Sequence, residues 1–216
     1  GLLALSLPAR ADDLDPHLKA LSDRSFSVKQ QAVVQLAAGE DPRVVGVLRP
    51  MLDGQLYVRK ADDRLVLVAD SDNGYRLTDA FSGEALGESG KRDVSKVAIN
   101  NSLRESLRAA LAGLELAHPE GAVRERSARQ LINNPQPDLL PLIERRLAKE
   151  DDGDVLDNLR LARAMIQLSD PDAAERLAAV EALNRVLYPE VRGALGRVAE
   201  SDADPQVKAA AVKALD

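Results

Sequence analysis

A nine-residue pattern that occurs four times constrains the fold of this chain most strongly. Each copy has Ala or Ser at its fifth position and Leu at its ninth: VKQQAVVQL from Val28, VRERSARQL from Val123, ERLAAVEAL from Glu175 and VKAAAVKAL from Val207. Positions one, five and nine lie on the same face of an α-helix. A small residue at the centre of that face lets a neighbouring helix approach closely, so the pattern predicts closely packed helices.

Three of the copies are followed by a second segment that has Pro at its second position. These segments are DPRVVGVLRPML from Asp41, QPDLLPLIERRL from Gln136 and YPEVRGALGRVA from Tyr188. Pro suits the first turn of a helix, where its missing N–H is not needed. A looser helical pair, DVLDNLRLARAMIQL and SDPDAAERLAAVEAL, begins at Asp154. The predicted unit is therefore a helix, a short turn and a second helix.

The helical units are regularly spaced. Val123 lies 32 residues before Val155, and Glu175 lies 32 residues before Val207. Helix pairs that repeat at about this period stack so that each pair buries its apolar face against the next. We therefore expect an all-α fold, a HEAT-like α-solenoid of paired antiparallel helices, with a small antiparallel β-meander inserted in it.

The insertion is the segment LYVRKADDRLVLVADSDNGYRLTDAFSGEALG, which starts at Leu56. Apolar and polar residues alternate along it, and ADD, DSDNG and FSG mark turns. Asn73-Gly74 is a hairpin signal because both residues tolerate positive φ. The pattern predicts strands over 55–60, 64–69 and 75–78, with room for a short strand after Gly83.

These features divide the chain into four parts: a signal-peptide remnant (1–11), a first HEAT-like unit (12–52), the β-insertion (53–93) and further HEAT-like repeats (94–216). The first part, GLLALSLPARA, has an apolar run followed by a small-x-small cleavage pattern. A first amphipathic helix is the alternative interpretation. In the last part, Asn101 or Ser102 is the expected N-cap of the first helix.

Composition and motifs argue against several classes of function. The net charge of −6 and the pI near 5.1 argue against nucleic acid as a partner. There is no Cys, and His17 and His118 lack the spacing of a metal site. DSDNG fails as a calcium loop because Ala69 and Ala80 fall at ligand positions, and the acidic KEDDGD from Lys149 predicts a solvated turn. No catalytic or nucleotide-binding motif is present, so we expect neither an enzyme nor a cofactor.

The aromatic residues suggest an interaction surface. Three of the five aromatic residues, Tyr57, Tyr75 and Phe81, lie in the insertion, with Arg59 and Arg76 beside them. Tyr is favoured at interfaces because it offers a large area and a hydroxyl group. These five residues are therefore the candidate protein-interaction residues. The alternative is that a small sheet needs its aromatic residues for a core of its own.

The order of these segments resembles a known family. A signal-like start, a HEAT-like helical pair, the insertion, INNSLR from Ile99 and further HEAT-like units are together similar to the N-terminal extracytoplasmic region of the urea ABC transporter permease family, which is related to branched-chain amino acid permeases. The resemblance covers essentially the whole chain, and the insertion with INNSLR is its most specific part.

The resemblance implies a place on the periplasmic side of a bacterial inner membrane, in an importer of urea or related small amides. The implied partners are transporter subunits, a periplasmic substrate-binding protein and the protein's own membrane domain, which would follow Asp216. The first hypothesis is thus an accessory interaction domain of this permease. A free-standing periplasmic HEAT-like scaffold is the alternative. A HEAT-like lyase is the third hypothesis, but the sequence shows no set of catalytic residues that would support it.

Overall fold

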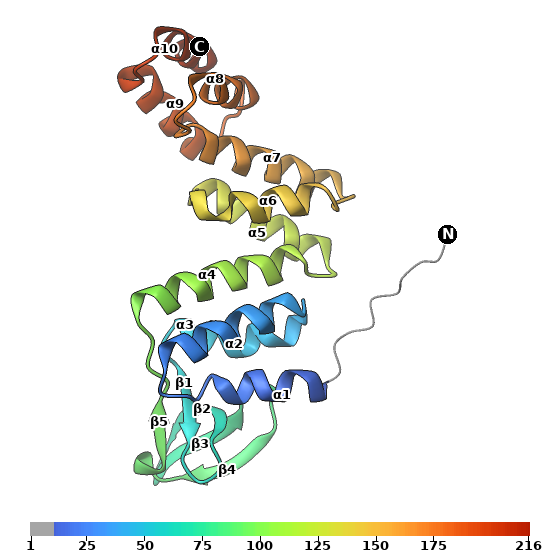
Figure 1. Ribbon diagram of the computed structural model, residues 1–216, viewed down its shortest axis with the longest axis vertical. Helices are drawn as coiled ribbons and strands as arrows, with labels where there is room; N and C mark the ends of the chain where they lie inside the picture. Colours follow the sequence, from blue (N-terminus) through green and yellow to red (C-terminus); the bar gives the residue numbers. More distant parts are fainter. Residues whose placement is uncertain (1–10) are drawn as a thin grey trace, which may run out of the picture. The chain divides into compact units, whose positions relative to one another are not determined.

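A computed structural model describes residues 11–216 of the chain. Over these residues the fold is mostly helical, with ten α-helices and a small five-stranded antiparallel sheet (Figure 1). The chain forms two compact units, one up to Glu115 and the other from Leu116. The predicted signal remnant lies outside the described residues apart from Ala11, which begins the first helix.

The first unit contains four helices: α1 (Ala11–Ala20), α2 (Phe26–Ala38), α3 (Val45–Leu52) and α4 (Asn101–Leu116). The helical segments predicted from Val28 and Asp41 are therefore confirmed as α2 and α3. Pro42 opens a 3-10 turn, η1 (Pro42–Val44), directly before α3. The Asp41 side chain accepts a hydrogen bond from the Arg43 amide at 2.9 Å, which satisfies a free donor at this helix start.

The small fifth residue of the nine-residue pattern is buried in all four copies, as expected for close helix packing. These residues are Ala32, Ser127, Ala179 and Ala211. Their helices contact neighbours inside their own unit, for example α2 against α1. In the first unit one apolar core joins α1–α4 to one face of the sheet, and it includes Leu36, Leu48, Met51, Leu56, Leu103 and Leu107.

The sheet has five strands, whereas the sequence pattern predicts three with room for a fourth. The strands are β1 (Leu56–Arg59), β2 (Arg64–Ser71), β3 (Gly74–Asp79), β4 (Ala85–Ser89) and β5 (Val94–Lys96), in the order β4-β3-β2-β1-β5. The three predicted strands are β1–β3, and β4 is the short strand after Gly83. Alternation missed β5 because three residues are too few to show a period, and the strand forms by pairing with β1.

The predicted turn at Asn73-Gly74 is wrong by one residue. Ser71 pairs with Gly74, so the two loop residues are Asp72 and Asn73, and only Gly74 has a positive φ (+152°). A Cβ at Gly74 would collide with the carbonyl oxygen of Ser89 in β4. The glycine is therefore required by the close approach of β4 and by its own φ, not by the central positions of the turn.

The predicted N-cap of α4 is also wrong by one residue. The helix begins at Asn101, and the Asn100 Oδ1 accepts a hydrogen bond from the Leu103 amide at 2.9 Å. This is the usual geometry of an Asn cap, which satisfies a free donor in the first turn. Neighbouring Asn and Ser residues all suit a cap, so composition alone did not distinguish between Asn100, Asn101 and Ser102.

The second unit contains six helices: α5 (Gly121–Asn133), α6 (Leu140–Leu147), α7 (Gly153–Gln167), α8 (Ala173–Ala182), α9 (Pro189–Ser201) and α10 (Pro205–Leu215), with a 3-10 turn, η3 (Pro137–Leu139), before α6. α7 contacts α5, α6 and α8, and α10 contacts α8 and α9. All the helical segments that the sequence predicts after Val123 are present.

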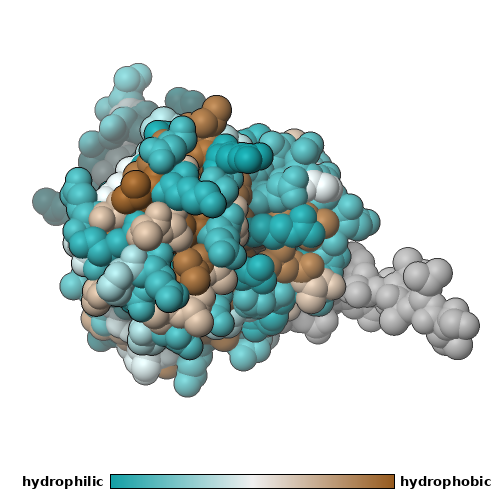
Figure 2. All heavy atoms as spheres, turned by 90° about the horizontal axis from the view of Figure 1, so that it is seen from above, coloured by the Kyte–Doolittle hydropathy of each residue, from teal (hydrophilic) through white to brown (hydrophobic). Residues whose placement is uncertain are grey.

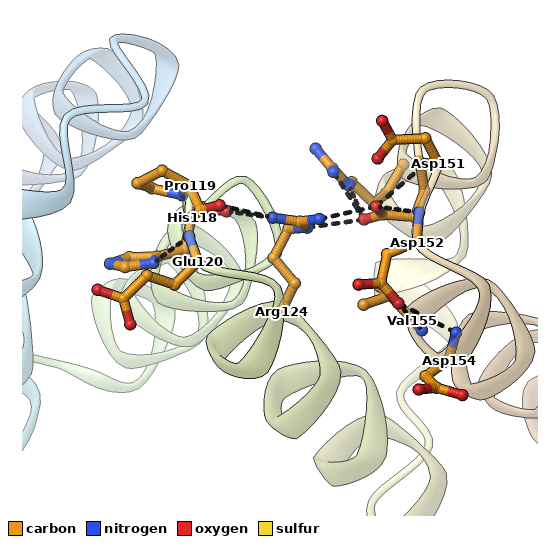
Figure 3. A network of polar contacts seen from close by, with 10 residues as sticks. His118, Pro119, Glu120, Arg124, Asp151, Asp152, Asp154 and Val155 are labelled. Carbon is orange, nitrogen blue, oxygen red and sulfur yellow. Dashed lines mark hydrogen bonds and ion pairs between the residues drawn. The ribbon is translucent and has the colours of Figure 1, made fainter.

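Arg124 of α5 joins three segments of the second unit (Figure 3). Its Nη1 donates to the carbonyl oxygens of His118 and Pro119, at 2.9 and 3.0 Å. Its Nε and Nη2 each donate to one carboxylate oxygen of Glu150 at 2.9 Å. The Glu150 side chain is fully buried. The prediction of a solvated turn for KEDDGD is therefore wrong at this residue, because arginines compensate the buried charge.

Arg176 of α8 makes the same set of contacts 52 residues later. Its Nη1 donates to the carbonyl oxygens of Asp170 and Pro171, and its Nε and Nη2 donate to the carboxylate of Asp202 at 2.8 and 2.9 Å. The same offset relates the first residues of α5 and α8, and those of α7 and α10. The repeat in this unit thus spans three helices, whereas the sequence spacing predicts pairs.

Candidate functional site

Two of the predicted interaction residues, Tyr57 and Tyr75, meet on the outer face of the sheet. Leu56 and Val58 of β1 belong to the core shared with the helices, so Tyr57 between them points to the opposite face. The rings of Tyr57 and Tyr75 lie 6.2 Å apart between centroids, tilted by 52°. Both residues are half-buried. We call the surface formed by Tyr57, Tyr75 and Lys91 the tyrosine face.

A small second core lies beneath the tyrosine face. Val66, Leu77 and Val94 are buried in it, and the two tyrosines pack against them together with Val68 and Leu86. Aromatic side chains that cover a sheet in this way bury apolar area while the hydroxyl groups can stay in contact with water. The tyrosines therefore help to hold the sheet together, as the alternative interpretation of the sequence proposes, and they still offer partly exposed rings.

Charged groups surround the tyrosine face. The Lys91 ammonium lies 5.0 Å from the centroid of the Tyr75 ring and 3.1 Å from the Asp70 carboxylate, and the hydrogen bond to Asp70 raises the pKa of Lys91. Arg59 alternates with Val58 and so shares the face of Tyr57. Its guanidinium binds both oxygens of Asp62, at 2.9 and 2.7 Å, which fixes it at the end of the β1–β2 hairpin.

The other two predicted residues lie elsewhere. Arg76 alternates with Tyr75, so it points to the opposite face of β3, where it is exposed. Phe81 follows β3 and packs beside the core shared with the helices, and the Arg43 guanidinium lies 4.9 Å from its ring. The structure thus gathers Tyr57, Tyr75 and Arg59 on one face and separates Arg76 and Phe81 from them.

Phe81 borders a groove of about 750 Å³ in the first unit. Its lining is rich in charge and comes from α1, η1 and the ends of β2 and β3: Asp15, Leu18, Lys19, Arg43, Asp62, Asp63, Arg64, Leu65, Asp79, Phe81 and Ser82. Acidic and basic side chains share this lining with the apolar side chains of Leu18, Leu65 and Phe81. This groove can make polar contacts with a ligand or with a segment of a partner protein.

Asp79 organises one wall of this groove. Its Oδ1 accepts hydrogen bonds from the amides of Phe81 and Ser82 at 3.0 and 2.7 Å, and its Oδ2 accepts one from Arg64 Nε at 2.6 Å. Burial acts to raise the pKa of Asp79, but these hydrogen bonds outweigh it and the pKa lies below its usual value. The sequence analysis did not identify Asp79 as a site residue. A signal was present, because an Asp whose side chain can bind the amides two and three residues later is typical of a turn.

The second unit has a groove of its own, of about 810 Å³. α7, α8 and the loop after α8 line it, and this loop holds Leu187, whose exposed fraction is 76%, and Tyr188. The Arg129 guanidinium stacks 3.6 Å from the centre of the Tyr188 ring. Figure 2 shows one face of the molecule, on which brown hydrophobic residues lie among teal hydrophilic ones. The exposed Leu187 shows that the second unit presents apolar surface.

Comparisons with protein-family models and with curated proteins found no match for this chain. Among residues 11–216, no helix has the length and apolar character needed to cross a membrane. Within the same range, no three His, Asp or Glu side chains are grouped so that they could hold a metal ion. The surface features described so far are the tyrosine face and the grooves beside Phe81 and Leu187.

Proposed function

We propose that this chain is an extracytoplasmic interaction domain of an ABC transporter permease that imports urea or related small amides, and that it binds a partner protein through the tyrosine face. The transporter part of the proposal rests on the resemblance of the insertion and INNSLR to that permease family. The interaction part rests on one observation, the pair of half-exposed tyrosines at 6.2 Å with a cation beside them.

The tyrosine face has the character of a binding hot spot. Tyr and Arg are enriched in such spots, where a rigid ring supplies area at low entropic cost, and Arg59 shares this face with the two tyrosines. The small core beneath holds both rings in place before a partner arrives, which reduces the ordering cost of binding. The proposed partner is the periplasmic substrate-binding protein of the same transporter, because such a protein has to dock on the extracytoplasmic side of a permease.

We further propose that the helices form a HEAT-like α-solenoid on which the sheet is an insertion. The 52-residue repetition of the Arg–carboxylate contacts supports this part, because the repeats of a solenoid share the same internal interactions. Insertions in solenoids tend to lie on one face and to carry recognition. Such an arrangement would present the tyrosine face as an addition to a regular scaffold.

Replacing Tyr57 and Tyr75 together with Ser is expected to weaken binding of the substrate-binding protein at least tenfold, because the largest contact area is lost. Calorimetric titration of this chain against that protein, with and without urea, measures the effect. Val34→Ser is the matched control, since Val34 is exposed on α2. It removes apolar area of the first unit away from the sheet.

A second variant separates binding from folding. Lys91→Glu reverses an exposed charge beside Tyr75 and leaves the small core intact, so it should change affinity while the circular dichroism spectrum stays the same. Equal binding by the wild type, the double Ser variant and Lys91→Glu would exclude the tyrosine face as the interface. No binding by the well-folded wild type would exclude the substrate-binding protein as the partner and favour the alternative of a free-standing scaffold with another partner.

A further inference from the structure

Lys29 of α2 is a buried cation without a carboxylate partner. Its exposed fraction is 4%, its ammonium donates to the Ala98 carbonyl oxygen at 2.7 Å, and it lies 5.0 Å from the centroid of the Phe26 ring. No carboxylate among residues that the structure describes forms an ion pair with it. Burying an unpaired ammonium is costly, so such groups normally have a counter-charge. Lys29 therefore lacks the counter-charge that a buried ammonium normally has.

The second unit shows what the usual partner is. In the nine-residue pattern, Lys29 occupies the second position, as do Arg124 and Arg176. Both arginines donate to the carbonyl oxygens of the two loop residues five and six positions earlier, whereas Lys29 donates to Ala98. Each arginine also binds a carboxylate that follows 26 residues later. The residue 26 positions after Lys29 is Gln55, which is neutral. The first unit thus keeps the cation of the repeat and lacks its anion.

The elements around Lys29 occur at the same spacing along the chain as the corresponding elements of the second unit. An offset of 95 residues relates Lys29 to Arg124, and the same offset relates η1 to η3 and the start of α3 to that of α6. It also relates Gln55 to Glu150. Gln55 is therefore the residue that corresponds to Glu150, and the first unit has no carboxylate at this position.

Lys29 lines a groove of about 470 Å³, which suits a small ligand. The lining comes from the α1–α2 loop, α2, β1 and the β5 segment: Ser22, Asp23, Arg24, Lys29, Val58, Lys60, Asp63, Ser95, Lys96, Val97 and Ala98. Basic residues outnumber acidic ones here by four to two, whereas the whole chain has 29 basic and 35 acidic residues. The groove is therefore locally cationic in an acidic protein.

The charges that face Lys29 do not neutralise it. The Asp23 carboxylate accepts a hydrogen bond from the Ser25 amide at 2.7 Å, and the Lys60 ammonium donates to the Arg92 carbonyl oxygen at 2.7 Å. Burial lowers the pKa of Lys29, and Asp23 opposes this only in part. An anion bound in the groove would supply the missing counter-charge.

We infer that this groove binds a small oxyanion, a phosphate or carboxylate group, through the Lys29 ammonium. The oxyanion takes the electrostatic role that Glu150 and Asp202 have in the second unit. Such a group can come from a free solute or from an anionic lipid headgroup. The inference does not depend on the tyrosine face, so either proposal can fail without the other.

The test is an NMR titration of the ¹⁵N-labelled chain with inorganic phosphate and with acetate, at constant ionic strength. We expect saturable shifts of the amide signals of Lys29 and Val97–Ile99, and at least tenfold weaker binding in Lys29→Met. Met fills similar volume without a charge, so the variant should fold. Lys213→Met, which removes an exposed Lys of α10, is the control and should bind as the wild type does.

Sedimentation with vesicles of phosphatidylglycerol, against phosphatidylcholine, identifies the source. Binding to the anionic vesicles that Lys29→Met abolishes assigns the site to a lipid headgroup. Saturable shifts with phosphate or acetate and no vesicle binding assign it to a free solute. Shifts that do not saturate, or that are the same in Lys29→Met and the wild type, would overturn the inference, as would vesicle binding that the Lys29→Met substitution leaves unchanged.

Discussion

Glu150→Gln is expected to destabilise the second unit by about 3–5 kcal/mol, the typical cost of removing one partner from a buried ion pair. The Glu150 carboxylate accepts hydrogen bonds from Arg124, from Arg146 and from the amides of Asp151 and Asp152. Gln keeps the shape, but its NH₂ group faces donors and the two arginines lose their counter-charge. Urea unfolding followed by circular dichroism, with hydrogen exchange of α5 and α7 amides, measures the loss.

The same interaction predicts a pH dependence. Burial acts to raise the pKa of Glu150, but the hydrogen bonds from Arg124, Asp152 and Arg146 outweigh it and lower the pKa from 4.5 to about 2. A lowered pKa in the folded state means that the stabilisation is complete above pH 4.5 and is lost as the pH falls toward 2. The difference in stability between wild type and Glu150→Gln should therefore be constant near neutral pH and shrink in this acidic window.

Two further variants serve as controls. Asp157→Asn removes an exposed ion pair with Arg160 on α7, and it should cost less than about 1 kcal/mol. Asp202→Asn removes the equivalent carboxylate of the second copy and should be clearly more costly than Asp157→Asn, because the Asp202 side chain is only 6% exposed. If Glu150→Gln were as mild as Asp157→Asn, the buried pair would not be a stabilising element.

The helices were predictable from the sequence because each carries a local signal. The small fifth residue and the apolar ninth residue of the pattern define a buried face without knowledge of the partner helix, and Pro42, Pro137 and Pro189 mark the starts of second segments. β5 was not predictable in this way. Its three residues form a strand because β1 offers an unpaired edge, which is a property of the tertiary structure.

The candidate site was predictable only in part. Strand alternation explains why Tyr75 and Arg76 face opposite sides, but the pairing of Tyr57 with Tyr75 depends on the register of three strands. Lys29 could not be recognised as buried because lysine is usually exposed, and VKQQAVVQL gives no sign of it. The missing counter-charge of Lys29 can be recognised only when the contacts of Arg124 and Arg176 are known, because these arginines occupy the same position of the pattern and each binds a carboxylate.

Gly74→Ala is expected to destabilise the first unit by about 2–6 kcal/mol. The φ of +152° lies in a region that residues with a Cβ rarely adopt, which costs about 1–3 kcal/mol. The collision of that Cβ with the Ser89 carbonyl oxygen adds about 1–3 kcal/mol, because the neighbour is backbone and can yield only if β4 moves. Urea unfolding of the chain measures the effect, and hydrogen exchange should show the largest loss of protection in β4.

Gly83→Ala separates the two causes. Gly83 also has a positive φ, +74°, but nothing lies within 4 Å of a Cβ placed there, so only the backbone term of about 1–2 kcal/mol applies. Equal costs for the two variants would mean that β4 does not approach Gly74 as described. Since Tyr75 pairs with Ser89 directly beside the collision, Gly74→Ala should also disturb the tyrosine face and weaken partner binding, whereas Gly83→Ala should leave that binding unchanged.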